Sequence, residues 1–123
     1  MKVIFKCDSF LFPAEFNSSQ TAKEIIQKLP LESTVSTWGQ EIYFDIGFKA
    51  SAEGATMKVK SGDIAYWPQG KCLCIFFGPT PASTTEDPIP ASPVVLVGQT
   101  QANKEELRAI ELGEKISLEL SRE

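Results

Sequence analysis

The stretch that most constrains the fold is residues 62–81, where two apolar runs flank a tight turn and end at a proline-bounded exit. The turn, Pro68-Gln69-Gly70, suits a three-residue hairpin loop, because proline fixes its own φ and glycine takes the left-handed position of a bulge. Both alternating sets of side chains in the second run are apolar, namely Cys72, Cys74 and Phe76 against Leu73, Ile75 and Phe77. We therefore expect a strand that is central in its sheet, or one whose outer face forms a binding surface.

Alternation with a period of two predicts further strands on either side of this hairpin. They cover residues 2–7, 10–16, 33–48, 94–97 and 116–121, while residues 49–61 form a loop with room for a short strand at 57–59. Pro13 cannot donate to a ladder, so it should lie at a bulge or on an unpaired edge.

The run 33–48 is either one long strand or two strands joined at Gly39. On one of its faces the pattern places Trp38, Ile42, Phe44, Ile46 and Phe48, and on the other Glu41, Tyr43 and Asp45. We expect the second face to be the wet one, because it carries the carboxylates.

One convincing helix is predicted near residues 19–28. Its apolar positions, Ala22, Ile25, Ile26 and Leu29, recur with the spacing of an amphipathic helix. Asn17, Ser18 and Ser19 are candidate N-caps, and Pro30 ends the helix. Asn103 is expected to cap a helical turn at residues 104–108.

The 123 residues form a single domain, residues 1–123, of about the size that buries two-thirds of its unfolded surface without disulfides or metal. About eight short strands and one good helix indicate an all-β barrel or sandwich, and the strand count does not separate the two.

The charge pattern disfavours several partners. The chain has 16 acidic and 12 basic residues, and its lysines are scattered, whereas nucleic-acid binding needs a clustered basic face. No apolar stretch reaches the roughly 18 residues of a membrane span, and the start Met1-Lys2-Val3-Ile4-Phe5-Lys6 is unlike a signal peptide. Three cysteines, an odd number, do not make a disulfide framework and fit a reducing compartment. We therefore expect a cytoplasmic protein, and from the charge pattern and the lack of an apolar span we expect it to bind neither nucleic acid nor membrane. Its oligomeric state is left open.

Histidine is absent, which removes the commonest general base and the commonest metal ligand together. A Ser-His-Asp or Cys-His arrangement is thereby excluded. Cys72 and Cys74, with Cys7 nearby if its strand is a neighbour, could bind a soft metal, but buried free cysteines are ordinary core residues. We expect no metal and no cofactor.

Aromatic side chains supply the candidate ligand site. Trp38, Tyr66, Trp67 and Phe77 either line an apolar groove or belong to the core. Glu41, beside Tyr43, is a candidate anchor for a ligand amine or hydroxyl, against the alternative of a solvated strand carboxylate. Asp45 lies about 13 Å further along the strand, beyond the span of a glycosidase carboxylate pair. Thr80 completes the set of candidate ligand-binding residues.

Four segments carry a resemblance to a known family. They are the helix start Thr21-Ala22-Lys23, the run Trp38-Gly39-Gln40-Glu41-Ile42-Tyr43-Phe44, the run Gly62-Asp63-Ile64-Ala65-Tyr66-Trp67-Pro68, and the run Phe76-Phe77-Gly78-Pro79-Thr80-Pro81. Over nearly its whole length the chain resembles the small, single-domain cyclophilin-like proteins of bacteria and archaea. The resemblance implies a closed or nearly closed eight-stranded barrel with helical cover, but no activity, because the function of this family is itself uncertain.

The residues of a prolyl isomerase do not carry over. True cyclophilins use an arginine on a barrel strand beside Gln, Phe and His residues, whereas the only arginines here are Arg108 and Arg122, outside the predicted strands. We therefore expect a non-catalytic binder of a small molecule or peptide. One alternative is an atypical peptidyl-prolyl isomerase, and another is an interaction module that uses the proline-rich loop 78–93.

Overall fold

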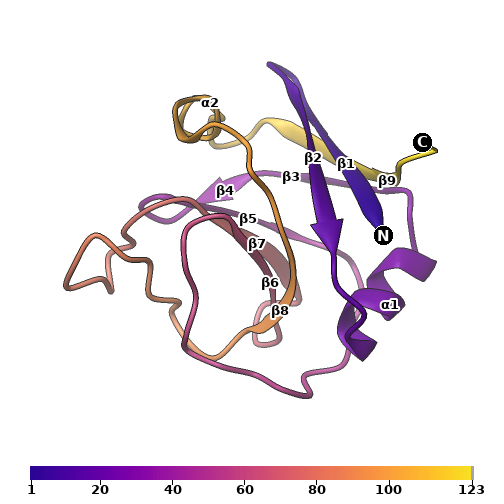
Figure 1. The fold of residues 1–123 in the computed structure, drawn as a ribbon. Coiled ribbons are helices and arrows are strands. Elements are labelled where there is room, and N and C mark those ends of the chain that lie inside the picture. Colours follow the sequence, from indigo (N-terminus) through magenta and orange to yellow (C-terminus); the bar gives the residue numbers. More distant parts are fainter. Residues whose placement is uncertain (123) are drawn as a thin grey trace.

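A single antiparallel sheet curls into a nearly closed barrel in the computed structural model, which describes residues 1–122 (Figure 1). Its strands are β1 (Lys2–Cys7), β2 (Leu11–Phe16), β3 (Leu31–Thr34), β4 (Ser36–Thr37), β5 (Glu41–Asp45), β6 (Asp63–Trp67), β7 (Cys72–Phe76), β8 (Val95–Gln99) and β9 (Lys115–Leu120). The main helix is α1 (Gln20–Gln27), and α2 (Lys104–Arg108) is a short second one.

One bent strand joins the two ends of the sheet and so nearly closes the barrel. The sheet order is β3-β9-β1-β2-β8-β6-β7-β5-β4, so its two ends are β3 and β4. These ends are separated in the sequence by Val35 alone, with β3 paired to β9 and β4 paired to β5. When β3 and β4 are counted as one bent strand, the nine strands become eight, which confirms the expected nearly closed, eight-stranded barrel.

The hairpin of residues 62–81 is central, as its two apolar faces predict. β7 pairs with β5 on one side and β6 on the other, and every residue of β7 is buried. The turn differs from the expectation, because Lys71 takes the positive φ of 53° and Gly70 does not. Gly70 is required for another reason: a Cβ there would collide with the ring of Trp67.

Of the two alternatives for residues 33–48, the correct one is two strands joined at Gly39. β4 and β5 form a hairpin in which Thr37 faces Ile42, and Gly39 in the turn has φ of 62°. The turn breaks the count of alternate positions, so the expected grouping of Trp38 with Ile42 and Phe44 is wrong. The last two lie in the core, whereas Trp38 lies on the outer side of the barrel with Glu41.

The core fills the inside of the barrel, and a second apolar cluster lies on its outside. Inside, the ring of Phe5 stacks on Phe12 at a centroid distance of 5.1 Å and meets the edge of Phe44 at 6.3 Å. The outer cluster consists of Ala65, Cys74, Phe76 and Val94. It is buried because the long loop that follows β7, which projects to the left in Figure 1, returns over the outer faces of β6 and β7.

Both helices begin where their caps predict. The Ser19 hydroxyl accepts from the backbone N–H of Ala22 at 3.2 Å, and the Asn103 side chain accepts from the N–H of Glu105 at 2.7 Å. Among residues 1–122, neither helix is long and apolar enough to cross a bilayer. The prediction of a short strand at residues 57–59 is wrong: in this part of the loop, only Thr56 forms a β-bridge, and its partner is Val94.

Pro13 causes no bulge in the ladder between β1 and β2. The pairing of β2 with β8 is confined to Glu15 and Phe16, so Pro13 lies outside that ladder. Pro13 therefore has no ladder partner on the side of β8, as suits a residue without an N–H group, although β2 is not the edge strand that the sequence predicts.

Candidate functional site

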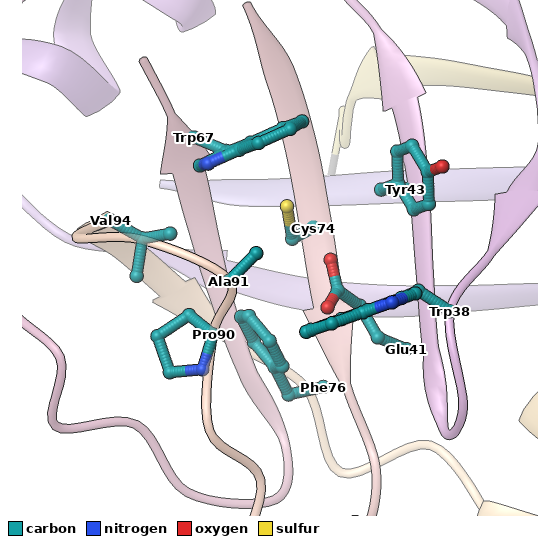
Figure 2. Close-up of a pocket in the computed structure, with 9 residues that line it drawn as sticks. All are labelled: Trp38, Glu41, Tyr43, Trp67, Cys74, Phe76, Pro90, Ala91 and Val94. Carbon is teal, nitrogen blue, oxygen red and sulfur yellow. The ribbon is translucent and has the colours of Figure 1, made fainter. Parts of the chain in front are cut away.

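A cavity of about 150 Å³ opens on the outer face of the barrel, between the sheet and the returning loop (Figure 2). It is lined by Trp38, Glu41, Tyr43, Trp67, Cys74, Phe76, Pro90, Ala91 and Val94. The walls are mainly apolar and aromatic, with one carboxyl group, which is the usual composition of a small-molecule site.

Strand alternation turns the lining side chains outward. On β5, Glu41 and Tyr43 face the cavity while Ile42 and Phe44 fill the core. The paired strand β7 places Cys74 beside Tyr43, with Ala65 of β6 on its other side. Cys74 and Ala65 are small, whereas the surrounding side chains are large and aromatic. The small side chains of Cys74 and Ala65 therefore leave an open space between the larger aromatic side chains around them.

The returning loop closes one side of the cavity and is tied to the hairpin. The indole N–H of Trp67 donates to the Ser92 hydroxyl at 2.6 Å, and that hydroxyl donates to Gln69 Oε1 at 2.9 Å. Pro90 is buried against the site. With Gly70 packed on its other side, the Trp67 ring is held in place from two directions.

Glu41 is the unusual residue of the site, because it is only 6% exposed. The alternative of a solvated strand carboxylate is therefore wrong. Burial raises the pKa of Glu41 to about 7, and a hydrogen bond from the Cys74 thiol opposes this only in part. The described residues that line the cavity include no lysine or arginine to neutralise the carboxylate. Asp45, on the same strand, is exposed.

The three cysteines are free thiols. Burial raises the pKa of Cys7 and of Cys72 to about 11, and burial together with the nearby Glu41 carboxyl raises that of Cys74 well above its usual value. A thiol in this state is a poor nucleophile, since the thiolate is the reactive form. Within residues 1–122, no group of three His, Cys, Asp or Glu side chains is placed to hold a metal ion.

Four of the seven predicted ligand-binding residues meet in this cavity: Trp38, Glu41, Tyr43 and Trp67. The other three, Tyr66, Phe77 and Thr80, do not line it. Tyr66 points into the core, where its hydroxyl accepts from the Ala50 N–H at 3.0 Å, so for this residue the core alternative is correct. Phe77 belongs to the inner cluster, and the Thr80 hydroxyl donates to the Ile89 carbonyl at 2.6 Å.

Sequence reasoning missed five lining residues. Cys74 and Phe76 carried a usable signal, because they form the second apolar face of their strand. Pro90, Ala91 and Val94 carried none, since nothing local in their sequence indicates which face of the sheet the loop covers.

Arg108, on α2, does not line the cavity. Its guanidinium donates to Gln40 Oε1 at 3.2 Å and forms an ion pair with Glu105 at 2.7 Å. Gln40 lies in the β4–β5 turn and Glu105 on α2, and neither lines the cavity, so this cation is already engaged outside it.

Comparisons with known proteins agree with this architecture. The model of the family described as Cyclophilin-like matches residues 1–119. The solution structure of the hypothetical protein AF2241 from Archaeoglobus fulgidus is 31% identical, with a TM-score of 0.79, and the match covers 98% of this chain and 95% of that one. No curated protein matches the chain.

Proposed function

The chain belongs to the cyclophilin-like family, and on that premise we propose that it is a non-catalytic binding domain for a small molecule or peptide. The ligand enters the outer cavity between Trp38 and Trp67. The observation that carries the proposal is the buried carboxyl of Glu41 at the base of an aromatic, partly open pocket.

A buried carboxyl group is costly for a fold unless something compensates it. Here the compensation inside the protein is a single thiol donor, Cys74, and the group retains a pKa of about 7. A structural role would be served better by an apolar side chain at this outward position. A role in contacting a ligand explains why the polar group is present, because polar groups placed in apolar pockets orient bound molecules.

The size of the cavity limits the ligand. A volume of about 150 Å³ is below the roughly 300–1,000 Å³ of sites for drug-sized molecules. A cavity of such volume accommodates about one benzene-sized group. The site therefore suits a compact metabolite, or one side chain of a peptide whose remainder lies outside the cavity.

The alternative of an atypical prolyl isomerase has less support from the site. An isomerase of the cyclophilin type uses a positioned arginine, and Arg108 is engaged with Gln40 and Glu105 outside the cavity. We expect isomerisation of a standard Xaa-Pro peptide to run at the uncatalysed rate. A rate enhancement that survives Arg108→Ala would show that other residues perform the reaction.

The proline-rich loop is also a weaker candidate for a partner surface than its composition indicates. Pro88 and Pro90 are buried, and the loop is closed on itself by the Ser83 hydroxyl, which donates to the Asp87 carbonyl at 2.7 Å. Replacement of the exposed loop residues 84–87 by a Gly-Ser linker, which leaves Pro90 and Ala91 of the cavity in place, separates the two functions. Loss of a protein partner with retention of small ligands would favour the loop as the functional surface.

Tryptophan emission tests the proposed site directly, because Trp38 and Trp67 are the only tryptophans. We expect a screen of metabolites and proline-containing peptides to find compounds that shift or quench this emission. Trp38→Phe and Trp67→Phe assign the signal to one ring at a time. If both variants leave the affinity of a confirmed ligand unchanged, the binding site lies elsewhere.

A further inference from the structure

We propose that the group bound in this cavity is a cation, an ammonium carrying methyl or other small alkyl substituents, held by Trp38, Tyr43 and Trp67 with Glu41 as its counter-charge. The inference rests on the proposed function and gives it a ligand class. It depends on the arrangement of the rings, on the charges around the carboxyl, and on the shortage of hydrogen-bond acceptors.

The rings surround the carboxyl on several sides. Figure 2 shows Trp38 and Trp67 on opposite sides of the space that Glu41 and Cys74 point into. The ring of Tyr43 stands edge-on to Trp67, with their centroids 6.4 Å apart and their planes at 81°. Several aromatic rings around one volume form the arrangement that attracts a cation through the negative faces of the rings, with tryptophan the strongest contributor.

The charges around the cavity also favour a positively charged ligand. An anionic ligand would meet Glu41 with no cationic side chain among the described lining residues. A neutral apolar ligand would remove water from the carboxyl without replacing it. A cation does the opposite, because it supplies the counter-charge that the buried carboxylate lacks.

Among the described residues, none of the titratable groups near Glu41 supplies a positive charge inside the cavity. From β7 it faces the Cys74 thiol, with Cys72 further along the strand, and both are held in the neutral form by burial. From β5 the neighbouring groups are Tyr43 and the exposed Asp45. From α2, Arg108 reaches Gln40 but does not line the cavity. The returning loop adds Pro90, Ala91 and Val94, which carry no charge.

The lining also favours an alkylated ammonium over a bare one. A primary ammonium has three N–H donors and needs an acceptor for each. The side chains that line the cavity offer two strong acceptor groups, the carboxyl of Glu41 and the hydroxyl of Tyr43, while the Trp67 N–H is a donor that already bonds to Ser92. Methyl groups on the nitrogen replace N–H donors and pack against the rings, so the positive charge is kept without unsatisfied donors.

The test compares two molecules of the same shape, choline and its uncharged analogue 3,3-dimethyl-1-butanol, by titration calorimetry and tryptophan emission. At pH 8 we expect choline to bind at least about tenfold more tightly, because only choline gains the ring and carboxylate attractions. Glu41→Gln should reduce that preference to less than about threefold. Asp45→Asn is the matched control, since it makes the same change on an exposed carboxylate of the same strand, and it should leave the preference unchanged.

Proton linkage gives a second measurement on the unmodified protein. With the pKa of free Glu41 at about 7 and a lower value in the complex, choline affinity should fall about tenfold between pH 8 and pH 6. About half a proton should be released per choline bound at pH 7, measured as heats in phosphate and in Tris buffer. The affinity of the uncharged analogue should not fall in this way.

Two outcomes overturn the inference. If both molecules bind equally and Glu41→Gln leaves choline affinity unchanged, the pocket binds ligands by shape alone, and the proposed function stands without the cation. If neither choline nor tetramethylammonium binds at millimolar concentrations, the cation class is wrong, while the wider metabolite and peptide screen tests the proposed function separately.

Discussion

The inner and outer faces of the strands β5, β6 and β7 differ in how completely they are packed and in the partners of their buried polar groups. The inner face is filled by apolar side chains, and its buried phenol, Tyr66, has a backbone partner. The outer face has a smaller apolar cluster, an open cavity, and the buried carboxyl of Glu41, with no lysine or arginine among the described residues that line the cavity. A sheet of the same strands is thus built for stability on one side and left incomplete on the other.

The difference teaches where to look for function in a domain without a catalytic motif. Packing alone explains the inner face, since large apolar side chains inside a barrel stabilise it by their burial. Packing does not explain a carboxyl held under a loop. Functional sites commonly reduce stability, so the outer face should respond to substitution in a different way from the inner one.

The largest effect is expected from emptying the inner face. Phe44→Ala should lower the free energy of unfolding by about 3–5 kcal/mol, because the phenyl ring is almost fully buried among other rings. Its neighbour Tyr43 points outward and is only partly buried, so Tyr43→Ala should cost about 1 kcal/mol. Urea denaturation measures both. Equal losses would remove the distinction between the two faces.

The next effect has the opposite sign. The pKa of Glu41 is raised in the folded chain, so the stability associated with its neutral form is fully present below about pH 4.5 and is lost as pH rises through about 7. Glutamine does not titrate. Glu41→Gln should therefore match the parent protein at pH 4 and exceed it by up to about 3 kcal/mol at pH 8. Asp45→Asn is the control; a Glu41→Gln variant that is less stable at pH 8 contradicts the prediction.

A smaller loss is expected at the edge of the cavity. Ser92→Ala removes the acceptor of the Trp67 N–H and the donor to Gln69, and should cost about 1 kcal/mol. The emission of Trp67, isolated in a Trp38→Phe background, should shift to the red as water reaches the ring. Ser9→Ala removes a longer, exposed hydrogen bond to Glu114 and should change neither quantity. An unchanged Trp67 spectrum would show that the loop is held by other contacts.

The smallest effect on stability is expected at Trp38, which lies at the β4–β5 turn and is partly exposed. Trp38→Leu should change the free energy of unfolding by less than about 1 kcal/mol, as is usual for positions outside the core. The same change should weaken a confirmed ligand by at least about threefold, because it removes one wall of the cavity. A large loss of stability with unchanged affinity would identify Trp38 as a packing residue.

Much of the fold could be predicted from the sequence, because the signals are local. Alternation gave both the core face of β5 and the two apolar faces of β7. Side-chain oxygens before the helices marked the caps at Ser19 and Asn103. A strand repeats every two residues and a cap acts within three, so neighbours in the sequence are enough to specify them.

Local patterns in the sequence predicted only part of the candidate site. Trp67 and Glu41 were found from their residue types, but Tyr66 and Phe77 were grouped with them although alternation turns both inward. Trp38 was placed on the wrong face because the turn at Gly39 restarts the alternation.

The sequence by itself determined which side chains point the same way within each strand and where each helix begins. Only the tertiary structure decided that Glu41 is buried. The cavity that holds its carboxyl is completed by Cys74 and Phe76 from β7, more than thirty positions further along the chain, and by Pro90 from further still. Burial, and with it the pKa near 7, depends on which distant segment covers a face, and no local pattern encodes that contact.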